Sequence, residues 1–229
     1  MDIQILQLLE GAKKAKGLTV VIDVFRAFSV ACYLSHNGAK DIIPIGNIEE
    51  AYMLKKENHK YVLVGERNER IPEGFDFGNS PTQILTEDFA EKTIVHTTSA
   101  GTQGLVNALG AHERLTGSFV NAPAIIRYIK KQDPTIVSLV CMGYSMKHPS
   151  EEDTLCAEYI KACIEDKPVD FNQMKEIIRN TSAKRFFAPE NQSFSPSSDF
   201  DLCLDLGKFD FVLKAEQMNG LLHLTPIKI

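Results

Sequence analysis

The chain has 229 residues, of which 44% are hydrophobic and 24% charged, and it carries a net charge of −5 at pH 7. This length is enough to bury a core in one or two domains. The sequence has no long basic block that could follow a phosphate backbone, which disfavours a nucleic-acid-binding protein. An anionic small molecule must therefore be held by a local site.

Short apolar runs alternate with helical patterns along the chain. The predicted strands cover residues 20–24, 42–45, 61–64, 93–97, 115–120, 135–141 and 209–213. The predicted helices cover residues 27–36, 48–58, 103–108, 123–130 and 153–165. Most of the strand patterns are continuously apolar, as in strands covered on both faces. The alternation predicts an α/β fold with a mixed or largely parallel sheet.

The pattern predicts one domain over residues 1–229, with a C-terminal subregion at about 166–229 where strand signals are weaker. Within it, the polar run at residues 191–198 is expected to be a loop.

The cysteines and the N-terminal sequence indicate in which cellular compartment the protein is expected. The start of the chain lacks the basic and apolar segments of a signal peptide, and no apolar stretch approaches the roughly 20 residues that span a bilayer. The cysteine count is odd, there is no CxxC spacing, and several cysteines lie in apolar runs. We therefore expect reduced cysteines in a cytoplasmic protein; they are Cys32, Cys141, Cys156, Cys163 and Cys203.

Two strand ends are followed by an acid and an arginine. Asp23 closes the first predicted strand and Arg26 opens the helix after it, while Glu66 and Arg67 follow the strand at 61–64. Ligands of open α/β sheets bind outside the carboxyl ends of strands, where a carboxylate suits a hard metal ion and an arginine suits a phosphate or sulfonate. A capping aspartate and solvated ion pairs are the alternative interpretation.

Two loops are rich in small and hydroxyl residues. The run Gly74–Pro81 places Asn79 and Ser80 before a proline-initiated helix. The turn at residues 97–102 includes Thr98, Ser99, Gly101 and Thr102 and precedes another helix. Free N–H groups at such turns bind anions, although ordinary turn and capping roles explain the same residues.

Three acids, Glu151, Glu152 and Asp153, stand together at the start of the last long predicted helix. They suit either the first turn of a helix or a Mg²⁺ ion. The sequence contains neither a Cys-x₅-Arg phosphatase loop nor a His-Glu-x-x-His zinc helix. Those two routes to hydrolysis are excluded.

In order along the chain, these segments resemble the 2-phosphosulfolactate phosphatase family. The resemblance covers residues from about 20 to the end, and the most specific part is Gly74-Phe75-Asp76-Phe77-Gly78-Asn79-Ser80-Pro81. One departure is Ser99-Ala100-Gly101-Thr102-Gln103, where the family often has Asn-Gly-Thr-Arg, so a positive charge is missing. The family implies a three-layer α/β/α architecture and a Mg²⁺-dependent phosphatase that converts 2-phospho-3-sulfolactate to 3-sulfolactate, a step toward coenzyme M.

The resemblance and the motifs together predict the site. We expect Asp23, Arg26, Glu66 and Arg67 to be catalytic and Asp23, Glu66, Glu152 and Asp153 to hold Mg²⁺. We expect substrate contacts from Asn79, Ser80, Thr98, Ser99, Gly101 and Thr102. The alternatives are a phosphatase for another phosphorylated hydroxy acid or sugar phosphate, and a non-catalytic anion-binding protein. We expect no nucleic-acid or membrane partner, and homodimers are the commonest assembly.

Overall fold

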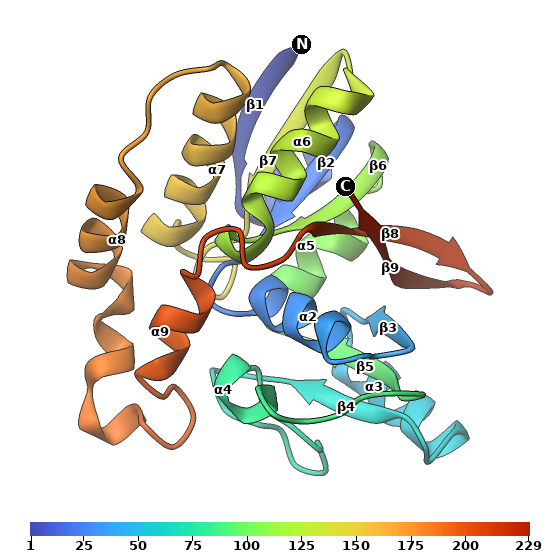
Figure 1. Ribbon diagram of the computed structural model, residues 1–229. Coiled ribbons are helices and arrows are strands. Elements are labelled where there is room, and N and C mark those ends of the chain that lie inside the picture. The colour runs from blue at the N-terminus through green and yellow to red at the C-terminus, as the bar shows by residue number, and fades with distance from the viewer.

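A six-stranded mixed sheet forms the centre of the fold in the computed structural model, which describes all 229 residues (Figure 1). Its first four strands in space are parallel and the last two form an antiparallel hairpin. The spatial order is β1 (Asp2–Gln7), β7 (Ile136–Cys141), β2 (Gly17–Ile22), β6 (Ala111–Gly117), β8 (Phe211–Met218) and β9 (Leu221–Lys228). The predicted α/β class with a mixed, largely parallel sheet is confirmed.

A second, smaller sheet contains three parallel strands. They are β3 (Asp41–Pro44), β5 (Thr93–Thr97) and β4 (Val62–Gly65), with β5 in the middle. All three segments are predicted strands, but the sequence does not show that they form a sheet of their own. The structure therefore adds a layer to the predicted three-layer architecture.

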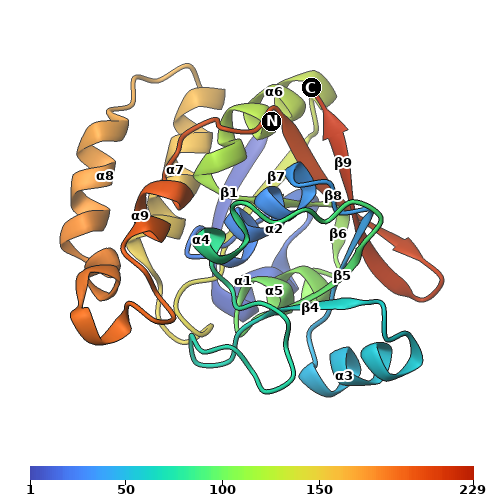
Figure 2. The same cartoon turned by 60° about the horizontal axis from the view of Figure 1, so that its bottom comes forward.

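Helices cover both faces of the large sheet and separate it from the small one (Figures 1 and 2). The helices are α1 (Leu8–Lys14), α2 (Ala27–His36), α3 (Ile48–Glu57), α4 (Pro81–Ile84), α5 (Gly101–Asn107), α6 (Ala122–Gln132), α7 (Glu151–Ile164), α8 (Phe171–Asn180) and α9 (Ser198–Cys203). Short 3₁₀ turns occur at Phe119–Asn121, Ser182–Phe187 and Pro189–Asn191.

The alternation of side chains along β2 sorts the core into two halves. Val20 and Ile22 pack with residues of α6 and α7, whereas Val21 packs with residues of α1, α2 and α5. The second half also includes Ile42 and Ile94 of the small sheet. Helix α2 is buried from Ala27 to Leu34 because it lies between the two sheets, which explains why its sequence is apolar all round.

Several boundaries differ from the predicted ones. The predicted strand at 115–120 is wrong at its carboxyl end: β6 stops at Gly117, and Ser118 and Asn121 form a capping box that turns the chain. The hairpin strand β9 is not predicted, and Pro226 within it is typical of an edge strand. Strand β1 and helices α1 and α8 are also not predicted.

All five cysteines are free, and four of them are buried. No helix combines the length and the apolar character needed to cross a bilayer.

Candidate active site

A narrow pocket forms where the carboxyl ends of both sheets meet. Asp23 follows β2 and Gly143 follows β7 in the large sheet, while Glu66 follows β4 and Ser99 follows β5 in the small sheet. This is the edge at which open α/β folds bind ligands. The complete lining is Asp23, Phe25, Arg26, Glu66, Glu69, Asn79, Ser99, Ala100, Gly143, Tyr144, Ser145, Glu152 and Arg185.

Three buried carboxylates converge on this pocket. Asp23, Glu66 and Glu152 are 5%, 8% and 3% exposed. Burial, together with the negative charges of Glu66 and Glu152, raises the pKa of Asp23 to about 7, although two backbone N–H groups act to lower it. The Oε2 atom of Glu152 is buried without any hydrogen-bond partner. Such crowding of acids at a strand end is typical of a site that takes a cation or a proton.

The turn at residues 97–102 binds the protein's own carboxylate. The Ser99 N–H donates to Glu66 Oε1 at 2.6 Å, and the Ser99 hydroxyl donates to Glu66 Oε2 at 3.1 Å. The hydroxyls of Thr98 and Thr102 cap each other's backbone N–H groups and do not line the pocket. The anion that this predicted cradle holds is therefore Glu66, which is fixed in orientation.

Gly101 allows helix α5 to approach Asp23. A Cβ atom at this position would lie 2.7 Å from Asp23 Oδ2 and 2.7 Å from the Ala27 Cβ. The Asp23 Oδ1 atom accepts the Ala27 N–H at 3.0 Å, so Asp23 is held between the starts of α2 and α5. Gly101 thus shapes the site by leaving room for Asp23.

Asp153 lies behind the pocket and joins two of its loops. Its Oδ1 accepts the Val24 N–H at 2.8 Å and its Oδ2 accepts the Gly143 N–H at 2.8 Å. Burial, together with Glu152 and Asp23, raises the pKa of Asp153 well above its ordinary value. Because both oxygens are engaged with the backbone, Asp153 positions the loops that carry Asp23 and Tyr144, and the structure does not bring it to the pocket surface.

Arg26 lines the pocket but is bound to a buried partner. Its Nη1 atom donates to Asp199 Oδ2 at 2.6 Å and to the Phe194 carbonyl at 2.8 Å, and the Arg26 and Asp199 side chains are 4% and 0% exposed. The other Asp199 oxygen accepts hydrogen bonds from Ser80 and Thr82. Arg26 and Ser80 therefore join the C-terminal segment to the site.

Asn79 projects into the pocket, and its Oδ1 is buried without a partner. Among the predicted residues, only Asn79 and Glu152 present such an unpaired buried atom to the pocket.

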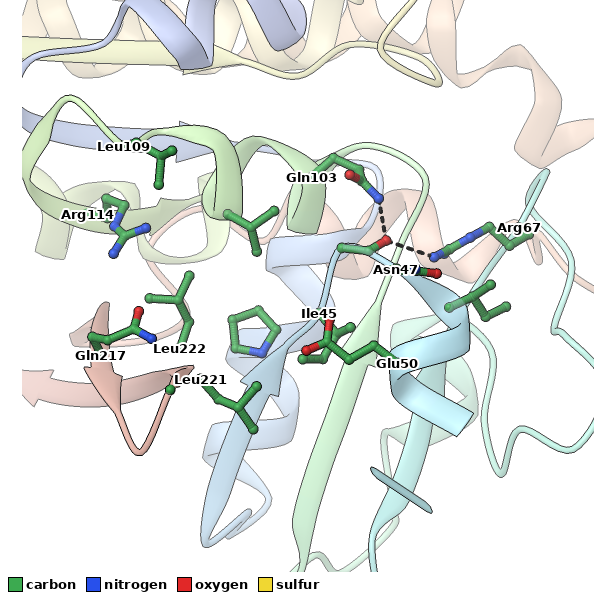
Figure 3. A pocket seen from close by; sticks show the side chains of 15 residues that line it. Ile45, Asn47, Glu50, Arg67, Gln103, Leu109, Arg114, Gln217, Leu221 and Leu222 are labelled. Atoms are coloured by element: carbon green, nitrogen blue, oxygen red, sulfur yellow. Dashed lines mark hydrogen bonds between the residues drawn. The ribbon is translucent and has the colours of Figure 1, made fainter. Parts of the chain in front are cut away.

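Arg67 points away from the pocket, although Glu66 faces it. Arg67 donates to the Gly46 carbonyl at 3.2 Å (Figure 3). It also donates to Thr97 Oγ1 at 2.7 Å and to the Glu66 carbonyl at 2.7 Å. Neighbouring residues in an extended segment direct their side chains to opposite sides. The structure thus separates the Glu66–Arg67 pair that the sequence suggests as one unit.

The pocket also contains a residue that belongs to no recognisable sequence motif, Arg185. Arg185, in the 3₁₀ turn Ser182–Phe187, lies 3.1 Å from Glu69 Oε1 and 5.2 Å from the centre of the Tyr144 ring. The Nε atom is the one that faces Glu69, and Nη2 donates to the Phe25 carbonyl at 3.3 Å, so the guanidinium has two protein partners. The only sequence signal is the basic–aromatic run at 184–187, which does not identify a site.

The carboxylates fit a Mg²⁺ ion better than a metal that needs a full protein cage. No three His, Cys, Asp or Glu side chains gather closely enough to form a metal site by themselves. Mg²⁺ commonly takes one or two carboxylates and completes its shell with water and substrate phosphate oxygens. Asp23 and Glu66 are consistent with such a partial set, and the buried, unpaired oxygen of Glu152 beside them remains as an acceptor for a proton.

Comparison with known proteins identifies relatives over nearly the full chain. Residues 3–218 match the family model described as 2-phosphosulpholactate phosphatase. A protein of Caldanaerobacter subterraneus subsp. tengcongensis, named "probable 2-phosphosulfolactate phosphatase", is 33% identical, with 89% of each chain covered. A protein of the same name from Bacillus subtilis is 33% identical, with 87% of each chain covered. One from Clostridium tetani is 35% identical, with 82% of each chain covered.

Proposed function

The chain belongs to the 2-phosphosulpholactate phosphatase family, and we propose on this premise that it hydrolyses 2-phospho-3-sulfolactate to 3-sulfolactate and phosphate. The observation that supports this most directly is the group of three buried carboxylates, Asp23, Glu66 and Glu152, at the carboxyl ends of the strands. Release of 3-sulfolactate for coenzyme M synthesis is part of the same proposal.

We propose that Asp23 and Glu66 hold a Mg²⁺ ion. The bound ion would neutralise phosphate charge and lower the pKa of a coordinated water. The Ser99 and Glu69 N–H groups fix the Glu66 carboxylate in advance. Helix α2 fixes Asp23 through the Ala27 N–H. Both ligands therefore need little reorganisation when the ion binds.

The open oxygen of Glu152 is assigned to proton transfer. It is the one buried carboxylate oxygen of the pocket without a partner, so it can accept the proton of the attacking water. The Asn79 side chain, whose Oδ1 is also unpaired, is assigned to substrate contact.

We assign Arg185 to binding the sulfonate, which is the anionic group at the other end of the ester from the phosphate. Arg26 is paired with the fully buried Asp199 and Arg67 faces the other side of the strand. Arg185 lines the pocket in an ion pair with Glu69 whose side chains are 19% and 22% exposed, so a substrate anion can replace Glu69 as its partner. The pocket has a volume of about 40 Å³, whereas small-molecule sites commonly have about 300–1,000 Å³. An ester must therefore separate Arg185 from Glu69 and Tyr144 as it enters.

The proposed reaction is tested by phosphate release from 2-phospho-3-sulfolactate, 2-phospholactate and an aryl phosphate, each with Mg²⁺ and with EDTA. We expect Mg²⁺-dependent release that is fastest from the sulfonated ester. Faster release of phosphate from one of the other esters would instead identify a phosphatase with a different substrate specificity. Binding without release from any ester would identify an anion-binding protein.

We expect Arg185→Gln to raise KM for the sulfonated ester by roughly 10- to 100-fold, because a hydrogen bond to a charged group contributes about 1.5–3 kcal/mol. KM for 2-phospholactate, which lacks the sulfonate, should change much less. Steady-state kinetics on both esters measure the difference. Arg179→Gln is the matched control, since Arg179 lies outside the pocket and stacks on Phe187. Equal losses on both esters would remove Arg185 from sulfonate recognition.

The free cysteines support a cytoplasmic location as part of this proposal. A homodimer is the assembly we propose, on the frequency of that symmetry alone.

A further inference from the structure

The largest pocket of the molecule is separate from the candidate active site. It has a volume of about 650 Å³, which lies within the range of small-molecule sites. Its lining comes from the end of β3 and the start of α3 with the loop between them, from α5, from β6, and from the ends of β8 and β9 with the turn between them (Figure 3). Arg67 adds one further side chain. The pocket therefore lies at the seam between the two sheets, a common position for ligand sites.

The polar groups of this second pocket favour an anion. Arg114 and Arg67 both line it, and Glu50 is the one acid. Arg67 already donates to three oxygen atoms. Arg114 makes a single hydrogen bond, from Nη1 to the Leu105 carbonyl at 3.2 Å, so most of its N–H groups have no protein acceptor. Two cations and one acid leave one positive charge, which suits a monoanion.

The remaining walls are apolar. Ile45, Leu221 and Leu222 line the space between the two arginines (Figure 3), and Val106 also belongs to the lining. Leu109 lies beside Arg114 and is 81% exposed, the most exposed large hydrophobic side chain of the protein. A ligand with an apolar body would cover this surface while its acid reaches the Arg114 guanidinium.

We propose that this second pocket binds a small organic monoanion with an apolar body, and that Arg114 pairs with its carboxylate or sulfonate group. Leu109 and Leu222 contact the apolar body. Arg67 lies at the opposite end of the pocket from Arg114 and already donates to protein oxygen atoms. It therefore adds positive charge without a new hydrogen bond to the ligand. The site is independent of the phosphatase proposal, because it shares no lining residue with the carboxylate pocket.

The test uses 8-anilinonaphthalene-1-sulfonate, a fluorescent aromatic monoanion, titrated against the full chain with Mg²⁺ present. We expect one saturable site and competition by benzoate, which carries a carboxylate on an apolar ring. Arg114→Gln should weaken the probe at least about tenfold, and Glu50→Gln should tighten it by removing the opposing charge. Leu109→Glu, an exposed position that tolerates exchange, should also weaken it. Arg127→Gln, on the exposed face of α6, is the matched control.

Equal probe affinity in the wild type, Arg114→Gln and Leu109→Glu would overturn the proposal. Absence of probe binding would also overturn it. Sedimentation of the same samples would then show whether a second copy of the chain covers the pocket. Phosphatase activity of each variant is measured separately, so failure of the reaction and failure of this site are distinguished.

Discussion

Asp23→Asn is expected to lower kcat/KM for phosphate-ester hydrolysis on the order of 10³-fold, about 4 kcal/mol of transition-state stabilisation. The exchange keeps an oxygen that can accept the Ala27 N–H, so the start of α2 is preserved. It removes the charge on which the proposed Mg²⁺ site depends. Kinetics over a range of Mg²⁺ concentrations measure the effect, and the dependence on Mg²⁺ should weaken together with the rate.

The same variant has an opposite effect on stability. The pKa of Asp23 in the fold is about 7, above its ordinary value of 3.8. The folded state therefore binds more protons than the unfolded state between these values, and Asp23 destabilises the metal-free protein as pH rises from about 4 to 7. In EDTA, Asp23→Asn should therefore lose less stability than the wild type between pH 5 and pH 8. Thermal unfolding of both proteins at the two pH values measures this difference.

Glu151→Gln is the control for the Asp23 variant, since Glu151 is an exposed acid beside Glu152 that does not line the pocket. It should leave rate and Mg²⁺ dependence unchanged. Full activity and unaltered Mg²⁺ dependence in Asp23→Asn would show that Asp23 does not hold the metal.

Arg26→Met is expected to destabilise the fold by about 3–5 kcal/mol, because it leaves the buried Asp199 carboxylate without its cation. For a protein of this size the melting temperature should fall by roughly 6 to 20 °C. Differential scanning calorimetry or urea unfolding measures the change. The double variant Arg26→Met/Asp199→Leu should recover part of the loss, since neither charge then remains buried.

The exposed pair of Arg127 and Asp210 provides the comparison for Arg26. Its side chains are 50% and 72% exposed, and Arg127→Ala should cost less than about 1 kcal/mol. Equal small losses in both variants would show that the Arg26–Asp199 pair does not hold the C-terminal segment to the site.

The sequence predicts strand and helix positions well where periodicity is strong. Helix α2 is predicted at 27–36 and found at Ala27–His36, because its run is apolar and bounded by turn residues. The split into two sheets is not predictable in this way, because the apolar patterns of β3, β4 and β5 are the same as those of strands in one sheet. Partner choice among strands depends on long-range packing that single segments do not encode.

The candidate site likewise contains some residues whose position follows from the order of elements along the chain and others whose position depends on the folded structure. Asp23, Glu66 and Glu152 lie together because strand ends and a helix start meet at one edge, which the chain order indicates. The direction in which Arg67 points depends on a one-residue alternation that sequence spacing leaves open. Arg185 enters from a segment with no strand or helix pattern, so only the folded chain reveals it.

The pairing of residue 26 with residue 199 has a consequence for biosynthesis on the ribosome. The carboxylates of the site are all translated by residue 152, but the anion that neutralises Arg26 follows 47 residues later, since 199 − 152 = 47. Until Asp199 leaves the exit tunnel, the nascent chain has an uncompensated cation in its interior and lacks the strands β8 and β9. Prematurely terminated chains should therefore be prone to degradation, and catalytic competence should arise only after nearly the whole polypeptide is complete.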